Sequence, residues 1–326
     1  MIERRLAFVV SLALVLSVAE AQAGRVYRLG MLSPGARPAA SFPMSSTLLP
    51  LILGELGYVV GQNLVVERRF AEGKLDRLPG LARELVRLRV DALVAFSPPA
   101  VQAARDATKT IPIVMLLAYS DPVELGFVAS FARPGGNVTG VALAAEPTMA
   151  GKRLELIKEL VPRAKRIAVL ATGEAQSRTQ VQWAQTAASS LGVKLVVVEA
   201  RDAGYDRAFS TMMVERANAL FVVASPLLTT DREQIIQLAA RHRLPAIYDW
   251  REHVEAGGLM AYGGSLSGFS RRAAMYVDRI FKGASPADLP VERANTYDLA
   301  INLKTARALG LTVPSSLLLR ATHVIE

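Results

Sequence analysis

Hydroxyl, carboxylate and aromatic side chains recur at one kind of position in this chain of 326 residues, directly after short apolar runs. In the first half these residues are Ser33, Ser97, Tyr119, Ser120 and Asp121. In the second half they are Thr172 to Glu174, Ser225, Tyr248, Asp249 and Tyr262 to Gly264. Polar anchors beside apolar and aromatic walls are typical of a pocket that binds a small molecule. The chemistry that they can supply is hydrogen bonding and charge pairing.

Ser97 and Pro98 have two compatible interpretations. Serine is a favoured N-cap and proline is favoured at the first helical position, so the pair predicts a helix that begins at Pro98. The start of a helix also directs N–H groups and a partial positive charge outward, which suits a carboxylate. We expect Ser97 both to cap this helix and to face a ligand.

Asp121 has two alternative roles. In Asp121-Pro122-Val123-Glu124 it fits a helix cap, with Glu124 at the third helical position. An aspartate at the edge of a cleft can instead pair with an ammonium group of a ligand. Cap preferences favour the structural role.

A second Ser-Pro pair, Ser225-Pro226, resembles the first, but we expect a loop after it. The segment Thr230-Asp231-Arg232-Glu233 has the pattern of a capping box, so the next helix is predicted to begin there. The Ser97 side of the cleft is therefore predicted to anchor an anion, and the Ser225 side to sense ligand shape.

Aromatic residues at strand ends are ambiguous. Tyr119, Tyr248, Trp250 and Tyr262 are each more typical of a core or a rim when taken alone. Together with the hydroxyl groups nearby, they predict an apolar pocket wall.

Residue types needed for catalysis are missing or scattered. The chain has no cysteine, and its three histidines, His242, His253 and His323, have no metal-ligand spacing and form no acyl-transfer triad pattern. Residues 134–137, Pro-Gly-Gly-Asn, read as a turn before a strand, in contrast to a cofactor-binding glycine loop that opens a helix. We expect no enzyme activity, no metal and no cofactor. A two-domain racemase-like or hydrolase-like enzyme is the alternative that these absences disfavour.

Strand and helix patterns alternate along the whole chain. Apolar runs predict strands at residues 26–32, 64–70, 92–96, 113–117 and 138–143, and again at 166–170, 195–199, 219–223, 246–248 and 259–262. Helix patterns lie between them at residues 48–56, 75–88, 100–108 and 123–131, and at 177–191, 206–217, 231–242 and 250–255. Continuous apolar strands separated by helices indicate α/β units with parallel sheets covered on both faces. Ligands bind beyond the carboxyl ends of such strands, where the polar residues lie.

The two halves of the chain are similar to each other. Residues 90–98, Val-Asp-Ala-Leu-Val-Ala-Phe-Ser-Pro, match residues 218–226, Asn-Ala-Leu-Phe-Val-Val-Ala-Ser-Pro. Three other pairs of matching positions are separated by nearly the same interval as Ser97 and Ser225. They are Arg28 and Arg166, Gly57 and Gly192, and Ile111 and Leu244. A constant offset indicates two tandem α/β units. Two such lobes predict a cleft between them.

The N-terminus has the pattern of a secretory signal peptide. Arg4 and Arg5 precede an apolar stretch at residues 6–18, and Ala21-Gln22-Ala23 provides a small-x-small cleavage site, so we expect cleavage after Ala23. A membrane anchor is the alternative, but the apolar stretch is shorter than the roughly 20 residues that span a bilayer. No cysteine follows to carry a lipid. A soluble periplasmic protein is therefore expected.

The net charge of +9 does not indicate nucleic acid binding. Lysine and arginine are scattered over amphipathic helices, as at Arg83, Arg87 and Arg89, without a basic run that contains aromatic residues. This is typical of a solvated basic surface.

At this point several motifs resemble a known family, the extracytoplasmic solute-binding proteins of ABC transporters related to tryptophan and aromatic amino acid binders. The matching segments are residues 56–64 (Leu-Gly-Tyr-Val-Val-Gly-Gln-Asn-Leu), 76–79, 120–123, 132–140 (Ala-Arg-Pro-Gly-Gly-Asn-Val-Thr-Gly), 151–156, 243–248 and 301–306. They span nearly all of the chain beyond the signal peptide. Two strand ends depart from the family pattern, Phe96-Ser97 and Ala171-Thr172-Gly173, so the family's preferred ligand does not transfer.

The resemblance implies a type I periplasmic binding fold, with two doubly wound lobes joined by three crossings that act as a hinge. We expect residues 24–143 and 266–296 in the first lobe and residues 144–265 and 297–326 in the second, with residues 1–23 removed. By position, the resemblance implies that Ser33, Ser97 and Asp121 face the ligand from the first lobe. It implies the same for Glu174, Ser225, Asp249 and Tyr262 from the second.

The function implied is that of a periplasmic receptor, expected to be a monomer, that captures a small carboxylated or aromatic molecule by hinge closure. It would deliver this molecule to an inner-membrane permease with its ATPase. A ligand-sensing subunit of the same fold, which hands its bound state to a membrane receptor, is the alternative. The identity of the ligand stays open at this stage.

Overall fold

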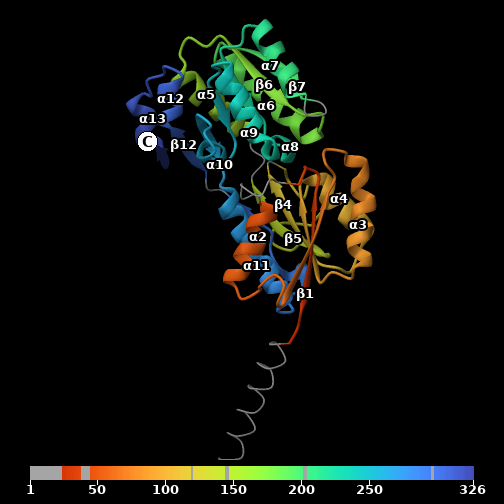
Figure 1. Cartoon of the computed structure of the whole chain (residues 1–326). Helices are drawn as coiled ribbons and strands as arrows, with labels where there is room; N and C mark the ends of the chain where they lie inside the picture. Colours follow the sequence, from red (N-terminus) through yellow and green to blue (C-terminus); the bar gives the residue numbers. More distant parts are fainter. Residues whose placement is uncertain (1–23, 38–44, 119, 144–146, 201–203, 295–296) are drawn as a thin grey trace, which may run out of the picture.

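The computed structural model describes residues 24–37, 45–118, 120–143, 147–200, 204–294 and 297–326. Two lobes lie one above the other, each with a twisted sheet between layers of helices (Figure 1). The alternation of strands and helices predicted from the sequence is confirmed in both lobes. In the described part of the chain, no helix combines the length and apolar character needed to cross a bilayer.

The first lobe is built on a six-stranded sheet in the order β11-β5-β4-β3-β1-β2. Its strands are β1 (Tyr27–Ser33), β2 (Leu64–Phe70), β3 (Ala92–Phe96), β4 (Ile113–Ala118), β5 (Val138–Leu143) and β11 (Glu292–Ala294). All neighbours in this sheet are parallel. Parallel strands need helical crossovers that cover both faces of the sheet, and the inner strands β3 and β5 are accordingly apolar runs, whereas the edge strand β2 is partly exposed.

Helices cover both faces of this sheet. They are α2 (Ser45–Glu55), α3 (Leu78–Arg87), which follows the 3₁₀ turn η1 (Leu75–Arg77), α4 (Pro98–Ala107) and α11 (Leu266–Phe281). Helices α2 and α11 share one core cluster, and α3 and α4 share another. Helix α11 therefore belongs to the first lobe by packing, although it follows most of the second lobe in sequence.

The second lobe is built on a seven-stranded sheet in the order β13-β12-β10-β9-β8-β6-β7. Its strands are β6 (Arg166–Ala171), β7 (Lys194–Glu199), β8 (Ala219–Val222), β9 (Ala246–Tyr248), β10 (Met260–Gly263), β12 (Asp298–Asn302) and β13 (His323–Ile325). Only the pairing of β10 with β12 is antiparallel.

The helices of the second lobe surround one large core cluster. They are α5 (Pro147–Leu160), α6 (Ala175–Ser190), α7 (Tyr205–Val214), α8 (Pro226–Thr230), α9 (Arg232–Arg241), α10 (Arg251–Glu255), α12 (Leu303–Ala308) and α13 (Ser315–Arg320). Helix α5 packs on α6, and α7 packs on α9. A further 3₁₀ turn, η2 (Pro286–Asp288), precedes β11.

The chain passes between the two sheets three times: after β5, between β10 and α11, and between β11 and β12. The first passage includes residues 144–146 and the third residues 295–296, which lie outside the described residues. The second passage is short, with only Gly264 and Ser265 between the strand and the helix.

Two sequence predictions about helices were wrong. Residues 123–131 form turns, because Gly126 adopts a φ of 67°, which interrupts a right-handed helix. The predicted loop after Ser225 is helix α8, which begins directly at Pro226.

The predicted capping box at residues 230–233 was also wrong. The Asp231 carboxylate accepts a hydrogen bond from Tyr205 Oη at 2.7 Å, and the Thr230 hydroxyl donates to the Pro226 carbonyl at 2.8 Å. With both side chains engaged elsewhere, α9 begins at Arg232 without a side-chain cap.

Candidate ligand-binding site

A pocket lies where the carboxyl ends of strands from both sheets face each other. We call it the inner pocket, and its cavity has a volume of about 80 Å³. Its polar lining residues are Ser33, Ser46, Ser97, Gln176, Ser225, Thr229 and Asp249. Its apolar walls come from Phe96, Leu116, Ala224, Pro226, Trp250, Leu266 and Phe269. Both lobes thus contribute to one pocket, as the strand-end rule predicts.

Ser97, at the end of β3, has an unusual backbone conformation. Its φ of 83° and ψ of 159° lie in a region that glycine occupies and other residues avoid. Helix α4 begins directly after it at Pro98, as predicted, but the hydroxyl does not cap this helix. The Oγ atom is buried and has no hydrogen-bond partner among the described residues. The predicted capping bond is therefore wrong, and the hydroxyl remains available to a ligand.

Ser225, at the corresponding place in the second lobe, differs from Ser97. Its Oγ accepts a hydrogen bond from the Leu227 N–H at 3.2 Å, which caps α8. The preceding residue is fixed by Gln180 of α6, whose amide both donates to the Ala224 carbonyl and accepts from the Ala224 N–H, each at 2.9 Å. These two bonds hold the end of the β8 segment at the pocket wall.

Asp249 is the buried carboxyl group of the inner pocket. It follows β9, is 1% exposed, and its Oδ2 atom has no hydrogen-bond partner among the described residues. Burial raises the pKa of Asp249 to about 7, with a further rise from the charge of Glu252 and an opposing effect from Arg153. A cationic ligand group beside Asp249 would stabilise its ionised form.

His253 does not supply this cation. Its Nδ1 atom lies 3.8 Å from Asp249 Oδ1, but burial lowers the pKa of His253 to about 3, so the ring is neutral at physiological pH. The ring stacks on Tyr248 with centroids 5.0 Å apart.

A second pocket adjoins the first. We call it the outer pocket, and it has a volume of about 390 Å³. Gln176 lines both pockets, and Ser97 and Pro98 are consecutive residues in the two linings. The outer lining includes Asp121 and Glu124 from the first lobe, Glu174 and Trp183 from the second, and no lysine or arginine. The lining of the outer pocket is therefore acidic.

Asp121 and Glu174 are the two predicted site residues with carboxylates in the outer pocket, and their surroundings differ. Asp121 Oδ1 accepts from the Val123 N–H at 2.8 Å and from the Glu124 N–H at 3.3 Å, and Arg293 Nη2 lies 3.8 Å from its Oδ2. The Asp121 carboxylate therefore stabilises a turn through backbone N–H groups, as a helix cap would. The turn does not lead into a helix, so the predicted cap is present only as this pair of hydrogen bonds. Burial raises the pKa of Glu174.

The structure brings most of the predicted site residues together. The inner pocket contains Ser33, Ser97, Ser225 and Asp249, and the outer pocket contains Pro98, Ser120, Asp121 and Glu174. Tyr119 lies outside the described residues.

Two predicted tyrosines line neither pocket. Tyr248 is 1% exposed and lies in the core of the second lobe, since its side chain alternates away from the pocket that Asp249 enters. The ring of Tyr262 packs against Tyr297, with centroids 6.1 Å apart, and the Tyr262 carbonyl accepts a hydrogen bond from Arg153.

Several lining residues were not predicted. Phe96 directly precedes Ser97 and Gln176 lies two residues after Glu174, so their proximity to the strand ends was the available signal. Leu266 and Phe269 come from α11, and no pattern near them indicates that this helix returns to the first lobe. Among the described residues, no group of three or more histidine, aspartate or glutamate side chains could hold a metal ion.

Comparison with known proteins gives a family match over most of the chain. The model of the family described as ABC transporter substrate binding protein matches residues 52–325. A curated relative, the tyrosine-binding protein of Clostridioides difficile strain R20291, is 29% identical over 260 residues, which cover 79% of this chain and 74% of that protein.

Solved structures support the same relationship. An ABC domain from Streptococcus pneumoniae in complex with L-Trp has 28% identity and a TM-score of 0.76, with 92% of this chain and 100% of that chain covered. A ligand-free, open substrate-binding protein with adhesive properties from Clostridium difficile has 27% identity and a TM-score of 0.59, with 92% and 99% covered. The predicted fold class, two doubly wound lobes of the type I periplasmic binding fold, is confirmed by these overlaps and by the sheet topology.

Proposed function

We propose that this chain, which belongs to the ABC transporter substrate-binding protein family, captures an amino acid or a similar aromatic molecule in the inner pocket. It then delivers this solute to a membrane permease and its ATPase. The capture involves no covalent step, so the chain acts as a receptor and not as an enzyme. The names of two similar proteins, which refer to tyrosine and to L-Trp, support an aromatic amino acid as the first ligand class to test.

One observation carries the proposal: two buried oxygen atoms of the inner pocket, Asp249 Oδ2 and Ser97 Oγ, have no hydrogen-bond partner among the described residues. Buried polar groups are nearly always satisfied in folded proteins, because an unpaired one costs about 1–3 kcal/mol. Both residues line a cavity between apolar walls. A ligand with polar groups at one end and an apolar body satisfies both sets of atoms.

The chemistry of the pocket assigns an orientation to such a ligand. Its ammonium group pairs with Asp249, and its carboxylate lies near the Ser97 hydroxyl and the start of α4, where the helix dipole favours an anion although Pro98 and Pro99 carry no N–H. Its ring packs among Phe96, Trp250 and Phe269, and a longer ligand extends past Gln176 into the outer pocket. Two or three charge-assisted hydrogen bonds, at about 1.5–3 kcal/mol each, together with apolar contact, are sufficient for micromolar affinity.

Hinge closure follows from the location of the pocket. A ligand that contacts both lobes has more partners when they are closed, and only this difference in affinity can shift the equilibrium. At nearly equal identity and coverage, the chain overlaps better with the L-Trp complex than with the open, ligand-free relative. This supports a closed arrangement of the lobes as the binding form.

The cellular setting belongs to the same proposal. Residues 1–23 act as a signal peptide cleaved after Ala23, and the mature protein is a periplasmic monomer. Residues 24–143 and 266–296 move against residues 144–265 and 297–326.

Native mass spectrometry of the purified protein, followed by calorimetric titration with L-tryptophan, L-tyrosine and L-phenylalanine, tests the proposal. Indole-3-acetate, which lacks the ammonium group, should bind more weakly than L-tryptophan. The double variant Ser97→Ala, Asp249→Ala should lose at least tenfold in affinity, which equals about 1.4 kcal/mol. Gln102→Ala is the control for a substitution outside the inner pocket, because Gln102 lines the outer pocket only. Unchanged affinity in a folded double variant would exclude the inner pocket as the site.

A further inference from the structure

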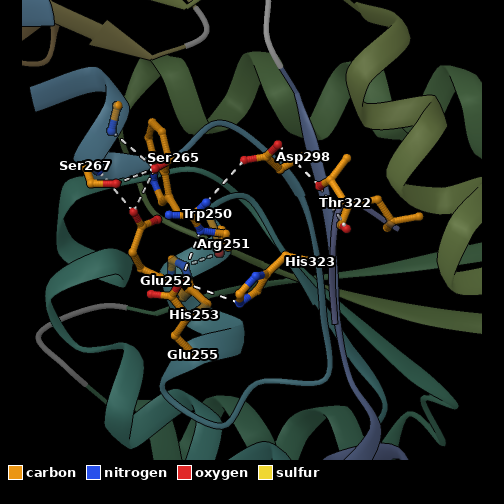
Figure 2. A network of polar contacts seen from close by, with 12 residues as sticks. Trp250, Arg251, Glu252, His253, Glu255, Ser265, Ser267, Asp298, Thr322 and His323 are labelled. Carbon is orange, nitrogen blue, oxygen red and sulfur yellow. Dashed lines mark hydrogen bonds and ion pairs between the residues drawn. The ribbon is translucent and has the colours of Figure 1, made fainter. Parts of the chain in front are cut away.

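Helix α10 of the second lobe contacts two of the three passages between the lobes. It begins directly after Asp249 and Trp250, which line the inner pocket. Its first residue, Arg251, lies 3.8 Å from Asp298, the first residue of β12 after the third passage, measured between Nη1 and Oδ2. Its second residue, Glu252, reaches the second passage (Figure 2). A five-residue helix thus lies between the candidate site and the hinge.

Glu252 makes its hydrogen bonds to the first lobe's helix α11. Its Oε1 atom accepts from the Ser265 Oγ–H at 3.2 Å and from the Ser267 N–H at 3.1 Å. Ser265 is also the N-cap of α11, through its bond from the Gly268 N–H. Glu252 therefore satisfies a backbone donor of the first helical turn from outside the helix, where a negative charge is also favourable. Glu252 as a whole residue is 3% exposed.

Trp250 adds an apolar contact across the same passage. Its ring centroid lies 5.9 Å from that of Phe269 in α11. It also lies close to Gly264, where a Cβ atom would come within 3.0 Å of the indole ring. The segment from Asp249 to Glu252 therefore contacts the cavity, the passage and the first lobe within four residues.

We propose that Glu252 is a positioning residue, which fixes the angle between the lobes by holding the start of α11 against the segment that carries Asp249 and Trp250. The two bonds lie at the pivot, where a small displacement becomes a large one at the far ends of the lobes. Without them, α11 and the pocket wall are held together by the Trp250–Phe269 contact alone among the contacts described above, and the free protein samples a wider range of openings. Binding then requires the ligand to order the hinge as well as to contact the pocket. This last effect depends on the proposed function, whereas the effect on the free protein does not.

The chain contains no cysteine, so a pair of introduced cysteines can carry spin labels without interference. Arg87 on α3 and Arg207 on α7 are exposed positions on the two lobes. The distance distribution between labels at these positions should be broader in Glu252→Ala than in the otherwise unmodified labelled protein, with no ligand added. Glu252→Gln keeps the acceptor oxygen and should restore the narrow distribution.

Glu255→Ala is the matched control, because Glu255 is on the same helix and pairs with Arg251 and His323, both in the second lobe. It should leave the distribution narrow. An unchanged distribution in Glu252→Ala, or equal broadening in Glu255→Ala, would overturn the proposal. If Glu252→Ala does not fold, Ser265→Ala, which removes one of the two donors, takes its place with the same expectations.

A second arm measures titration of the same variants with L-tryptophan and L-tyrosine. Glu252→Ala should bind roughly five- to tenfold more weakly, at the lower end of the usual range for coupling between sites. If neither amino acid binds the wild-type protein, the proposed ligand class fails, while the distance measurement still decides the role of Glu252.

Discussion

At the scale of single residues, the buried groups of the inner pocket are held in states that cost stability. Ser97 has a backbone conformation that suits glycine, and Asp249 is a carboxyl group removed from water. Such features persist where the surrounding structure imposes them, and they cluster at functional sites. The two residues therefore give the sharpest tests of the site.

Replacement of Ser97 should separate stability from binding. Ser97→Gly relieves the backbone strain and should raise the free energy of unfolding by about 1–3 kcal/mol. Ser97→Ala keeps the strain but removes the unpaired buried hydroxyl, so it should raise the free energy of unfolding by less than Ser97→Gly. Both variants lose the hydroxyl, so both should bind ligand more weakly. Urea denaturation of the ligand-free protein measures the effect on stability, and calorimetric titration measures the effect on binding. A Ser97→Gly protein that is less stable than wild type would contradict the assignment of backbone strain to Ser97.

Asp249 should give the stability a pH dependence that Asp249→Asn removes. Burial raises the pKa of this carboxyl to about 7, above the value of about 3.9 in an unfolded chain. Between these values the folded state binds more protons, so this group's contribution to stability falls as pH rises, by up to about 1.4 kcal/mol per pH unit. His253 acts in the opposite sense from about pH 3 to 6.5, because burial lowers its pKa.

The two contributions largely cancel in the wild type below about pH 6.5, the unperturbed histidine value. The stability of Asp249→Asn relative to wild type should therefore increase from pH 4.5 to 7.5. Urea denaturation at several pH values measures this difference. A difference that does not vary with pH would show that Asp249 is already paired in the folded protein.

At the scale of elements, the strand ends are fixed by bonds from neighbouring helices. The side-chain amide of Gln180 of α6 makes two hydrogen bonds to the backbone of Ala224, which directly precedes Ser225. This side chain is 3% exposed, so no water replaces it easily.

Gln180→Ala should destabilise the second lobe and weaken ligand binding together. It leaves a buried N–H and a buried carbonyl unpaired, at about 1–3 kcal/mol each, so a loss on the order of 2–4 kcal/mol is expected. Gln182→Ala, an exposed position on the same helix, should change neither property. The thermal unfolding midpoint and the ligand affinity are the measurements, and a Gln180→Ala protein with wild-type stability would show that these bonds contribute little.

Strands and long helices were more predictable from the sequence than the burial and hydrogen-bond partners of individual side chains. Apolar runs gave β3, β5 and β9 with the observed boundaries, because strands buried on both faces need continuous apolar sequence. Short helices were harder. His253 has charged neighbours in sequence, yet it is buried, since a five-residue helix has too few turns for a readable pattern.

The candidate site was predictable where chain position alone decides it. Ser33, Ser97, Ser225 and Asp249 follow strands, and the topology brings them to one cavity. Tyr248 stands at the same kind of position but faces the core, because neighbouring residues in a strand point to opposite sides. The role of α11 as a pocket wall depends on the return of the chain to the first lobe, which local sequence does not encode.

At the scale of the whole molecule, the two lobes are joined by apolar packing as well as by covalent passages. One core cluster of the first lobe includes Met149, Ala224 and Trp250 from the second. The inner pocket thus lies beside apolar contacts between the two lobes. The outer pocket has the opposite character, since carboxylates line it from both sides.

Repulsion between the outer walls should oppose closure. Glu124 comes from one lobe and Glu174 from the other, so closing the cleft brings like charges together in a partly desolvated space, whereas Arg293 partly offsets the charge of Asp121. Glu174→Gln should therefore shift the free protein toward shorter distances between labels on α3 and α7. It should also raise the affinity for an uncharged or zwitterionic ligand by about two- to fivefold, since surface charge pairs are worth at most about 1 kcal/mol.

The effect of Glu174→Gln should depend on salt and pH in a defined direction. It should shrink at 1 M salt, where the Debye length falls to about 3 Å. Burial raises the pKa of Glu174, so lowering the pH neutralises this residue before an ordinary glutamate and should bring the wild type closer to the variant. Arg178→Gln, a change of charge four residues further along at an exposed position on α6, tests whether any charge change on this wall has the same result. An effect of Glu174→Gln that persists in full at high salt would mean that shape, and not repulsion, sets the closing of the outer pocket.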